Sequence, residues 1–391
     1  MKKPRVAIIL THRIQYFINL FDELHRRNNL ELLVIYAHET KVVQDNGFGR
    51  KISWDNRAHT SFNQVVLPDS ATRPHGPFLN SRSRHLARTL AEFQPDLLYL
   101  NGYMNAIQLQ AWWWALRHQV PYLLRCDGDN IGRRSAWKAA VRRKLVFPFT
   151  RGACKVTHQG AQNKAFWAAN GATEAQLVWV PCVSDSQIFR VQAFASAAAR
   201  QEFRTQYNTG PGDLALVISG KLESRKRPQD AIRALALCKD LPVRLWILGS
   251  GVLEEELKNL ARELGVNDKI TWLGFKNQSQ IPAILQAADI LLHTSQADPW
   301  PYAILDGAIS GLALLLSDHT GSHPDWMAKP AAGMVFGVGK PDEIAGCLKT
   351  FVAQPKLLKA CQQAAVARAA DYTETNFCDI FEGLVTACRR P

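Results

Sequence analysis

Residues 214–237 read LALVISGKLESRKRPQDAIRALAL, and this stretch decides the fold. An apolar run (Ala215–Ser219) ends at Gly220, and an amphipathic run (Pro228–Leu237) follows after a short loop. This order predicts a buried strand, a tight turn and a helix, the repeating unit of an open α/β sheet. Ligands of such sheets bind outside the carboxyl ends of the strands, so a cationic loop at this place suits a diphosphate. A solvated basic loop would explain its four cations equally well: Lys221, Arg225, Lys226 and Arg227.

The same alternation of apolar runs and helical stretches extends over the rest of the chain. Further strands are predicted at Val243–Leu248, Ile270–Leu273, Ile290–Thr294 and Ala313–Ser317, and in the first half at Val6–Leu10, Leu30–Tyr36, Leu97–Leu100 and Tyr122–Arg125. Strands that alternate with helices favour parallel sheets covered on both faces. We therefore expect an α/β protein with two doubly wound, Rossmann-like domains that face a central cleft.

Two carboxylates flank another strand-to-helix turn. Residues 298–306 read DPWPYAILD, with Asp298 in the loop and Asp306 in the helix that follows. The first backbone N–H groups of this helix, at Tyr302 and Ala303, would favour a phosphate. The alternative is one N-capping aspartate and one exposed helical acid. Gly249-Ser250-Gly251 lacks the full GxGxxG pattern, which counts against a dinucleotide-dependent dehydrogenase.

Taken in order, these pieces resemble the donor-binding domain of glycosyltransferase family 4, in the GT-B superfamily, from about Leu214 to Asp325. The residues that carry the resemblance are Gly220, Lys221, Leu222 and Lys226; Leu248 to Gly251; Trp272 to Phe275; Ala288 and Asp289; Asp298 and Asp306; and Gly311, Gly321, Pro324 and Asp325. The first half resembles the acceptor domain of that family more loosely, through Thr11 and His12, Gly47 to Gly49, Leu124 to Asp127, and Val180 to Val183. The resemblance implies an acceptor-binding domain (1–185), a donor-binding domain (186–365) and a C-terminal helix (366–391) that packs back on the first domain.

The resemblance also implies roles for individual residues. Gly220, Lys221 and Lys226 would hold the diphosphate of a nucleotide sugar, with the N–H groups of Tyr302 and Ala303. Asp298 would face the donor sugar, Asp306 the ribose hydroxyls, and Gly274 and Phe275 the base. Lys226, Asp298 and Asp127 are the catalytic candidates, and His12 and Arg125 are candidates on the acceptor side.

Three departures from the family pattern concern the same site. Both acids are Asp where the family usually has Glu, so each reaches one methylene less. Pro301 stands at a position that is normally Gly and removes one N–H donor. Lys221 replaces a common Arg, which gives a point charge in place of a bidentate fork.

The function that follows is transfer of a sugar from a nucleotide-diphosphate sugar to a hydroxyl acceptor. The resemblance implies retention of anomeric configuration, and with two lysines on the leaving diphosphate we expect neither a metal nor another cofactor. A lipid-linked glycan in cell-surface polysaccharide or lipopolysaccharide assembly is the expected acceptor. A non-catalytic glycosyltransferase-like scaffold and a GT-B sugar-nucleotide epimerase are the alternatives.

The net charge of the chain, 47 − 34 = +13, lies almost wholly in its first half. Residues 1–185 hold 25 basic and 13 acidic side chains, a net +12. Residues 133–155 combine eight cations with no acid and with interleaved apolar residues, which suits an anionic membrane surface, although a solvated basic helix fits too. Of the three consecutive residues Trp112, Trp113 and Trp114, at least one is expected on the surface. No nucleic-acid-binding module accompanies the charge, so we expect no nucleic-acid partner.

The eight cysteines are scattered, without a CxxC pair, and free thiols in a reducing cytosol are expected. No uncharged apolar run reaches the ~18 residues of a membrane span, and the N-terminus does not have the pattern of a secretory signal. We therefore expect a cytoplasmic protein that attaches peripherally to the inner face of the plasma membrane.

Overall fold

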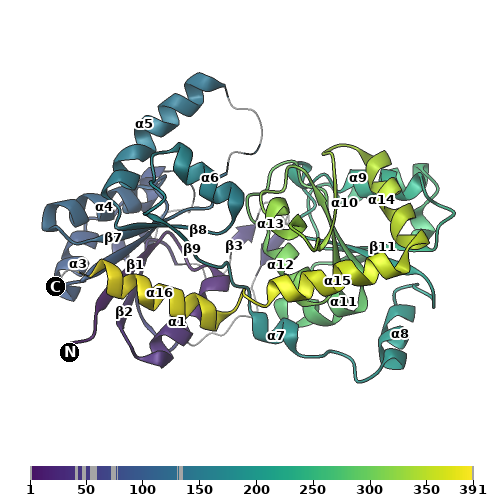
Figure 1. The fold of residues 1–391 in the computed structure, drawn as a ribbon, viewed down its shortest axis with the longest axis horizontal. Coiled ribbons are helices and arrows are strands. Elements are labelled where there is room, and N and C mark those ends of the chain that lie inside the picture. The colour runs from purple at the N-terminus through teal and green to yellow at the C-terminus, as the bar shows by residue number, and fades with distance from the viewer. Residues whose placement is uncertain are drawn as a thin grey trace. The chain divides into compact units, whose positions relative to one another are not determined.

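The computed structural model describes residues 2–39, 43–45, 50–52, 60–71, 76, 78–129, 131 and 135–389. The chain divides into two compact units, the first made of residues 1–41, 57–184 and 372–391, and the second of residues 42–56 and 185–371. Each of the two large sheets is parallel and is flanked by helices (Figure 1). Residues 47–49 and the cations Arg133 and Arg134 lie outside the described residues.

Unit 1 is built on a seven-stranded sheet of order β5-β2-β1-β6-β7-β8-β9. Its strands are β1 (Arg5–Leu10), β2 (Glu31–Tyr36), β5 (Asn63–Val66), β6 (Leu97–Asn101), β7 (Tyr122–Arg125), β8 (Lys155–His158) and β9 (Leu177–Trp179). Its helices are α1 (Gln15–Arg27), α2 (Pro68–Ala71), η1 (Phe78–Ser81), α3 (Leu86–Phe93), α4 (Ala106–His118), α5 (Ala136–Gly152), α6 (Ala161–Ala169) and α16 (Glu374–Cys388). A separate antiparallel pair joins β3 (Val43–Asp45) and β4 (Arg50–Ile52).

The two faces of this sheet carry separate hydrophobic cores. One core contains the buried side chains of α1 and α16, and the other those of α3, α4, α5 and α6. Because both faces of the central strands are covered, β1 and β6 read as continuous apolar runs rather than as alternating ones. The sequence therefore predicted these strands correctly.

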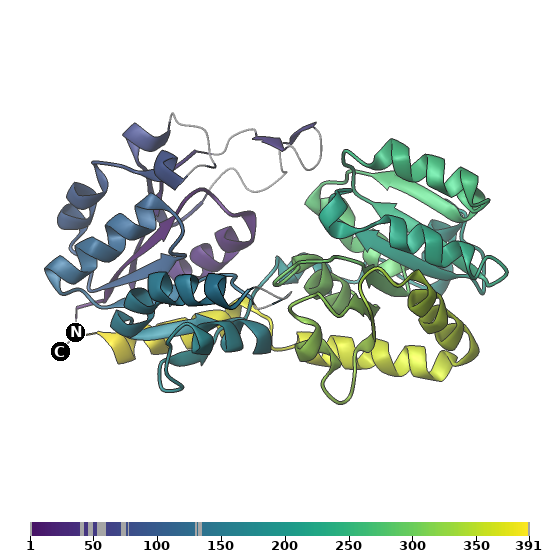
Figure 2. The ribbon, with the colours of Figure 1, turned by 90° about the horizontal axis from the view of Figure 1, so that it is seen from above.

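The C-terminal helix packs on unit 1. The Phe381 ring lies edge-on to Tyr99 of β6, with ring centroids 5.3 Å apart, and Asp379 pairs with Arg27 of α1 at 2.5 Å. Thr373 caps this helix by accepting a hydrogen bond from the backbone N–H of Asn376. The preceding helix α15 (Pro355–Ala369) stays with unit 2, so the return begins only after residue 371 (Figure 2).

The prediction of free thiols is wrong for two of the eight cysteines. Cys154, just before β8, forms a disulfide with Cys388 at the end of α16, and their Cα atoms are 5.9 Å apart. The sequence separation of 234 residues hides this pairing, because only the packing of α16 on unit 1 brings the two together. The other six cysteines are free thiols.

Unit 2 is built on a six-stranded sheet of order β12-β11-β10-β13-β14-β15. Its strands are β10 (Leu214–Ser219), β11 (Val243–Leu248), β12 (Ile270–Gly274), β13 (Ile290–His293), β14 (Ala313–Ser317) and β15 (Gly333–Phe336). Its helices are α7 (Ser186–Arg190), α8 (Ala197–Thr205), η2 (Ser224–Lys226), α9 (Gln229–Ala236), α10 (Glu254–Glu263), η3 (Asn267–Lys269), η4 (Gln278–Gln280), α11 (Ile281–Ala287), α12 (Tyr302–Ile309), α13 (His323–Met327), α14 (Pro341–Ala353) and α15.

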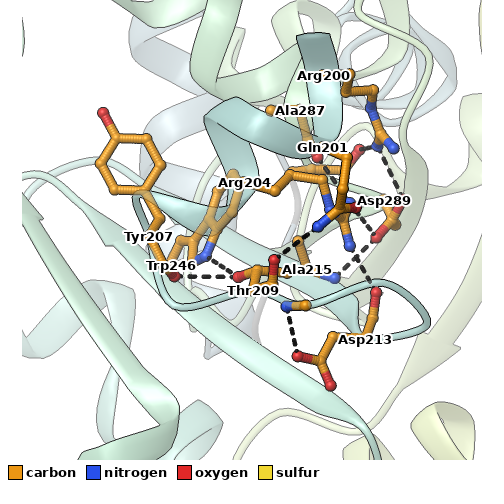
Figure 3. Close-up of polar contacts among 12 residues, drawn as sticks. Arg200, Gln201, Arg204, Tyr207, Thr209, Asp213, Ala215, Trp246, Ala287 and Asp289 are labelled. Atoms are coloured by element: carbon orange, nitrogen blue, oxygen red, sulfur yellow. Dashed lines mark hydrogen bonds and ion pairs between the residues drawn. The ribbon is translucent and has the colours of Figure 1, made fainter. Parts of the chain in front are cut away.

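A buried ion pair ties α8 to the start of two strands of this sheet. Arg204 of α8 is 3% exposed, and its Nη1 lies 2.9 Å from Asp289 Oδ2 (Figure 3). Asp289 precedes β13, and the same oxygen accepts a hydrogen bond from the backbone N–H of Ala215 in β10. Arg200 donates to the other carboxylate oxygen at 2.9 Å. Asp289, one of the residues behind the family resemblance, therefore joins α8 to β10 just before β13 begins.

Candidate functional site

Three neighbouring strands of unit 2 end at glycines. Gly220, Gly249 and Gly274 follow or close β10, β11 and β12, and all have positive φ (143°, 143° and 65°). The N–H of Gly220 donates to Leu248 O and that of Gly249 to Gly274 O, both at 2.9 Å, so the loops lie side by side. A Cβ atom on Gly249 would lie 1.9 Å from the carbonyl oxygen of Gly220. The sequence requires glycine here because the backbones approach too closely for a side chain.

The loop after β10 is bonded to the loop after β13, the neighbouring strand on its other side. Arg225 O accepts from the backbone N–H of Gln296 at 3.0 Å, and Lys226 O accepts from Thr294 Oγ1 at 2.7 Å. Arg225 Nη1 donates to Ala297 O at 2.5 Å. The two loops therefore form one unit at the carboxyl edge of the sheet.

This arrangement brings together the two predicted catalytic residues of unit 2. The Lys226 ammonium donates to Asp298 Oδ2 in a short ion pair. The Asp298 side chain is 12% exposed and that of Lys226 is 20% exposed, so the pair is largely shielded from water. The backbone of Asp298 is fixed as well, because its carbonyl accepts from the N–H of Gly321 at 2.8 Å.

A buried histidine adds to the electrostatics of this pair. His293 Nε2 lies 3.4 Å from Asp298 Oδ2. Burial alone would raise the pKa of Asp298, but His293 and Lys226 outweigh it and hold that pKa well below its usual range. Burial lowers the pKa of His293, so the imidazole is neutral at pH 7. Asp298 is therefore a carboxylate that neighbouring groups keep ionised.

Sequence reasoning missed His293 and the role of Arg225, whose Nη1 lies 4.0 Å from Asp298 Oδ2. The available signal for His293 was a lone polar side chain at the end of an otherwise apolar run, Ile290–His293. Such a residue is more often buried and satisfied than functional, and only its distance to Asp298 distinguishes the two cases.

The other donor-side candidates lie along the same edge. Tyr302 and Ala303 open α12, whose N-cap is Pro301 and not Asp298. Asp306 is 8% exposed in the middle of α12. The alternative of an N-capping aspartate and an exposed helical acid is therefore wrong. Lys221, Gly274 and Phe275 are half-buried at the ends of β10 and β12.

The three candidates of unit 1 follow strands of that unit's own sheet. Arg125 ends β7 and is 6% exposed, with its guanidinium 4.8 Å from the centroid of the Phe17 ring. Its Nη2 lies 3.4 Å from Asp127 Oδ1, which also accepts a hydrogen bond from Gln159. His12 follows β1, and its Nδ1 lies 2.9 Å from the hydroxyl of Thr11. The structure thus joins Arg125 to Asp127.

Residues 199–368 match the family described as glycosyl transferases group 1. We call this stretch, residues 199–368, the transferase segment. The transferase segment starts in α8 and ends in α15, so it contains the whole sheet of unit 2 and every donor-side candidate.

Two curated glycosyltransferases are similar to part of the chain. The first, from Campylobacter jejuni, is N-acetylgalactosamine-N,N'-diacetylbacillosaminyl-diphospho-undecaprenol 4-alpha-N-acetylgalactosaminyltransferase, 27% identical over 157 residues, 40% of this chain and 42% of that protein. The second is the lipopolysaccharide core biosynthesis glycosyltransferase LpsE of Rhizobium meliloti, 28% identical over 150 residues, 38% of this chain and 42% of that protein. The chain spans about two fifths of the length of both relatives.

The fold extends the similarity over the whole chain. Anabaena Alr3699/HepE, in a structure with UDP, superposes with a TM-score of 0.72 at 16% identity, covering 98% of this chain and 100% of that one. The predicted α/β fold of the GT-B type, with two parallel-sheet Rossmann-like units, is confirmed.

Within the described part of the chain, no group of three or more His, Cys, Asp or Glu side chains is placed to hold a metal ion. None of the described helices combines the length and the apolar character that crossing a bilayer requires.

Proposed function

We propose that this protein transfers a sugar from a nucleotide-diphosphate sugar to a hydroxyl acceptor. The observation that carries the proposal is the Lys226–Asp298 ion pair at the carboxyl edge of the unit 2 sheet, within the transferase segment. Glycosyl transfer builds positive charge on the sugar and negative charge on the leaving diphosphate. A fixed cation next to a fixed carboxylate in a shielded place supplies charges that match this separation.

In this proposal, different residues of unit 2 bind different parts of the donor. Lys221 and Lys226, together with the backbone at Gly220, Tyr302 and Ala303, bind the diphosphate. Asp298 faces the sugar, and Asp306 binds the ribose hydroxyls. The base packs at Gly274 and Phe275. The UDP in the HepE structure supports a nucleoside diphosphate as the ligand class.

The acceptor side belongs to unit 1. Asp127 contacts the acceptor hydroxyl or the reacting sugar, and Arg125, held by Asp127 and Phe17, is placed to bind an anionic part of the acceptor. His12 lines the same edge of the sheet. We further propose that the anomeric configuration is retained and that transfer needs no metal, since Lys221 and Lys226 neutralise the leaving group. The segment's similarity to transferases of family 4 is the basis for retention.

The acceptor that we propose is a lipid-linked glycan of cell-surface polysaccharide or lipopolysaccharide assembly. The names of both curated relatives support this, one by a diphospho-undecaprenol acceptor and the other by the lipopolysaccharide core. Helix α5 supports it too, because none of residues 136–145 is buried and Lys138, Arg143 and Lys144 are exposed there. We propose that this basic helix docks the protein on the anionic inner face of the plasma membrane.

A panel of nucleotide-diphosphate sugars, each incubated with the purified full chain, tests the proposed activity. We expect slow hydrolysis of one donor, with release of its nucleoside diphosphate, and faster release when extracted bacterial lipids are added. Binding without release from any donor would favour the non-catalytic scaffold. Conversion to an epimeric sugar nucleotide would favour the epimerase. Either result would overturn the proposed transfer.

A further inference from the structure

Helix α4 exposes an apolar ridge that the core does not use. The ridge consists of Leu109, Trp113 and Leu116, which are 40%, 63% and 43% exposed. Their spacing of four and three residues places them on one side of the helix. The opposite side carries buried side chains, among them Ile107 and Ala111. The ridge therefore points away from the sheet that α4 covers.

Helix α5 carries a second ridge. Trp137, Val141 and Leu145 recur every four residues and are 66%, 48% and 62% exposed, and the same series continues to the buried Phe149. Figure 1 shows the first half of α5 standing out beyond its neighbours. The core covers only the end of this apolar line, so its exposed first part is left for a partner.

The two ridges lie on the same layer of unit 1. The buried sides of α4 and α5 share one hydrophobic core, and the Trp112 ring of α4 packs on Phe149 of α5 with centroids 4.3 Å apart. The α4 ridge lies opposite the buried side of its helix, so it points outward from this face of the sheet, and α5 packs beside α4 in the same layer. The segment η1 contacts α4 and adds two more exposed apolar side chains, Phe78 and Leu79, which are 43% and 64% exposed.

The exposed apolar residues of the two units differ in kind. All the large exposed apolar side chains described in unit 1 come from the segment between Phe78 and Phe147, and four of them are aromatic. Those described in unit 2 are single valines and leucines spread over the sequence, from Val191 to Val366. Scattered aliphatics are ordinary on a protein surface, whereas several exposed aromatic side chains on one segment indicate a contact.

The charge around the ridges indicates the chemistry of that contact. Residues 97–173 contain eleven Lys and Arg side chains but only two acids, Asp127 and Asp129. A hollow of about 360 Å³ between α3 and α4 adjoins the ridge and is lined by Leu86, Trp113, Trp114 and Arg117, among others. Exposed aromatic and aliphatic side chains, with the exposed cations Lys138, Arg143 and Lys144 of α5, suit the boundary between the headgroups and acyl chains of an anionic bilayer.

We propose that the α4 ridge inserts into this boundary of an anionic bilayer beside α5, so that membrane contact involves both helices. This inference rests on the proposed membrane docking and extends it from a basic helix to a two-helix surface. The exposed cations of α5 attract the anionic leaflet over a distance that salt shortens. The α4 ridge, whose helix has Arg117 as its only Lys or Arg, contributes by burying apolar area, which salt does not screen.

Flotation of the full chain with vesicles tests the separate contributions of α4 and α5 to membrane binding. Vesicles of phosphatidylglycerol and phosphatidylcholine, and of phosphatidylcholine alone, are compared at low and high salt. We expect wild type to float with the anionic vesicles. The variant with Leu109→Ser, Trp113→Ser and Leu116→Ser should lose at least about tenfold in bound fraction at low salt. Val252→Ser, which removes a side chain that is 70% exposed in unit 2, is the matched control and should bind as wild type does.

Two further variants test the contribution of each helix to membrane binding. Trp113→Phe keeps an apolar ring, so it should bind normally and yet lose part of the emission that brominated lipids quench in wild type. The double variant Arg143→Gln and Lys144→Gln should weaken binding at low salt only. Circular dichroism and nucleoside diphosphate binding confirm that each variant is folded.

The outcomes separate the two proposals. If the triple serine variant floats as well as wild type while the α5 variant does not, the α4 ridge is not a membrane contact and the docking of α5 stands. If wild type floats with no anionic vesicle, membrane docking itself is wrong. If wild type then forms a dimer that the serine substitutions dissociate, the ridge is a protein interface instead.

Discussion

The ammonium group of Lys226 contacts the carboxylate of Asp298, 72 residues further along the chain, and both side chains are largely shielded from water. The two residues follow neighbouring strands, β10 and β13, so the fold of the sheet determines their contact. In the proposed reaction the lysine binds the leaving diphosphate, and the aspartate faces the sugar. The pair in the structure thus fixes both charges at the same point of the sheet edge.

Replacing the aspartate should uncouple binding from turnover. In Asp298→Asn the Lys226 ammonium loses its carboxylate partner, so it is free to interact with a diphosphate. We expect the variant to bind the nucleoside diphosphate product more tightly than wild type and to transfer sugar about a hundredfold more slowly. Calorimetric titration with the nucleoside diphosphate, alongside initial rates, measures both. Weaker binding together with normal turnover would show that the aspartate does not compete for the lysine.

The buried His293 should make stability depend on pH. Burial lowers the pKa of His293 in the folded state. Below pH 6.5, the usual pKa of histidine, the unfolded chain therefore binds a proton at this residue that the folded chain does not bind. The free energy of unfolding should therefore fall as the pH drops from 7 to 5, with a slope of at most about 1.4 kcal/mol per pH unit from this group. The charged groups that influence it are Asp298, Lys226 and Arg225. His158, whose pKa burial also lowers, adds a similar dependence.

Urea unfolding of His293→Gln between pH 5 and 7 isolates the contribution of this histidine. The slope should be smaller than in wild type, and a remainder from His158 should persist. His25→Gln, at an exposed position of α1, is the control. Asp298, whose folded pKa is also lowered, stays ionised in both states over this range and loses its stabilising effect only in more acidic solution, below about pH 4. An unchanged slope in His293→Gln would contradict the account of a neutral buried imidazole.

The Arg204–Asp289 pair should be structural. Asp289→Asn removes the charge that compensates the guanidinium of Arg204, a residue that is only 3% exposed. Loss of one partner of a buried ion pair costs about 3 kcal/mol or more of stability. We expect a lower midpoint in urea unfolding, with the nucleoside diphosphate still bound by the folded fraction. Asp240→Asn, at an exposed carboxylate, should leave the midpoint unchanged. A large loss of ligand affinity at unchanged stability would instead place Asp289 in the site.

Much of this molecule could be predicted from its sequence, for physical reasons. Strands buried on both faces, such as β10 and β13, are continuous apolar runs, and glycine marks the points where backbones meet, as at Gly220 and Gly249. The order of the loops along the chain was enough to expect Lys226 and Asp298 at one edge.

The rest depends on tertiary packing that local patterns do not encode. The Cys154–Cys388 disulfide needs the return of α16, and the exposed ridge of α4 becomes visible only once the buried side of that helix is known. His293 is the last residue of strand β13, and its apolar sequence neighbours gave no sign that it lies next to Asp298. For α5 the helical pattern was ambiguous, since one apolar line runs from the exposed Trp137 to the buried Phe149 and the sequence does not say where along it the core begins.

The release of nucleoside diphosphate from the preferred donor by Lys226→Ala, measured beside Lys356→Ala, tests the central claim most directly. Lys356 is an exposed lysine on α15 within the same transferase segment, so its substitution removes an equal charge far along the chain from the loop of Lys226. We predict that Lys226→Ala remains folded and releases the diphosphate at least about a hundredfold more slowly, while Lys356→Ala matches wild type. Wild-type turnover by Lys226→Ala would contradict its role on the leaving group.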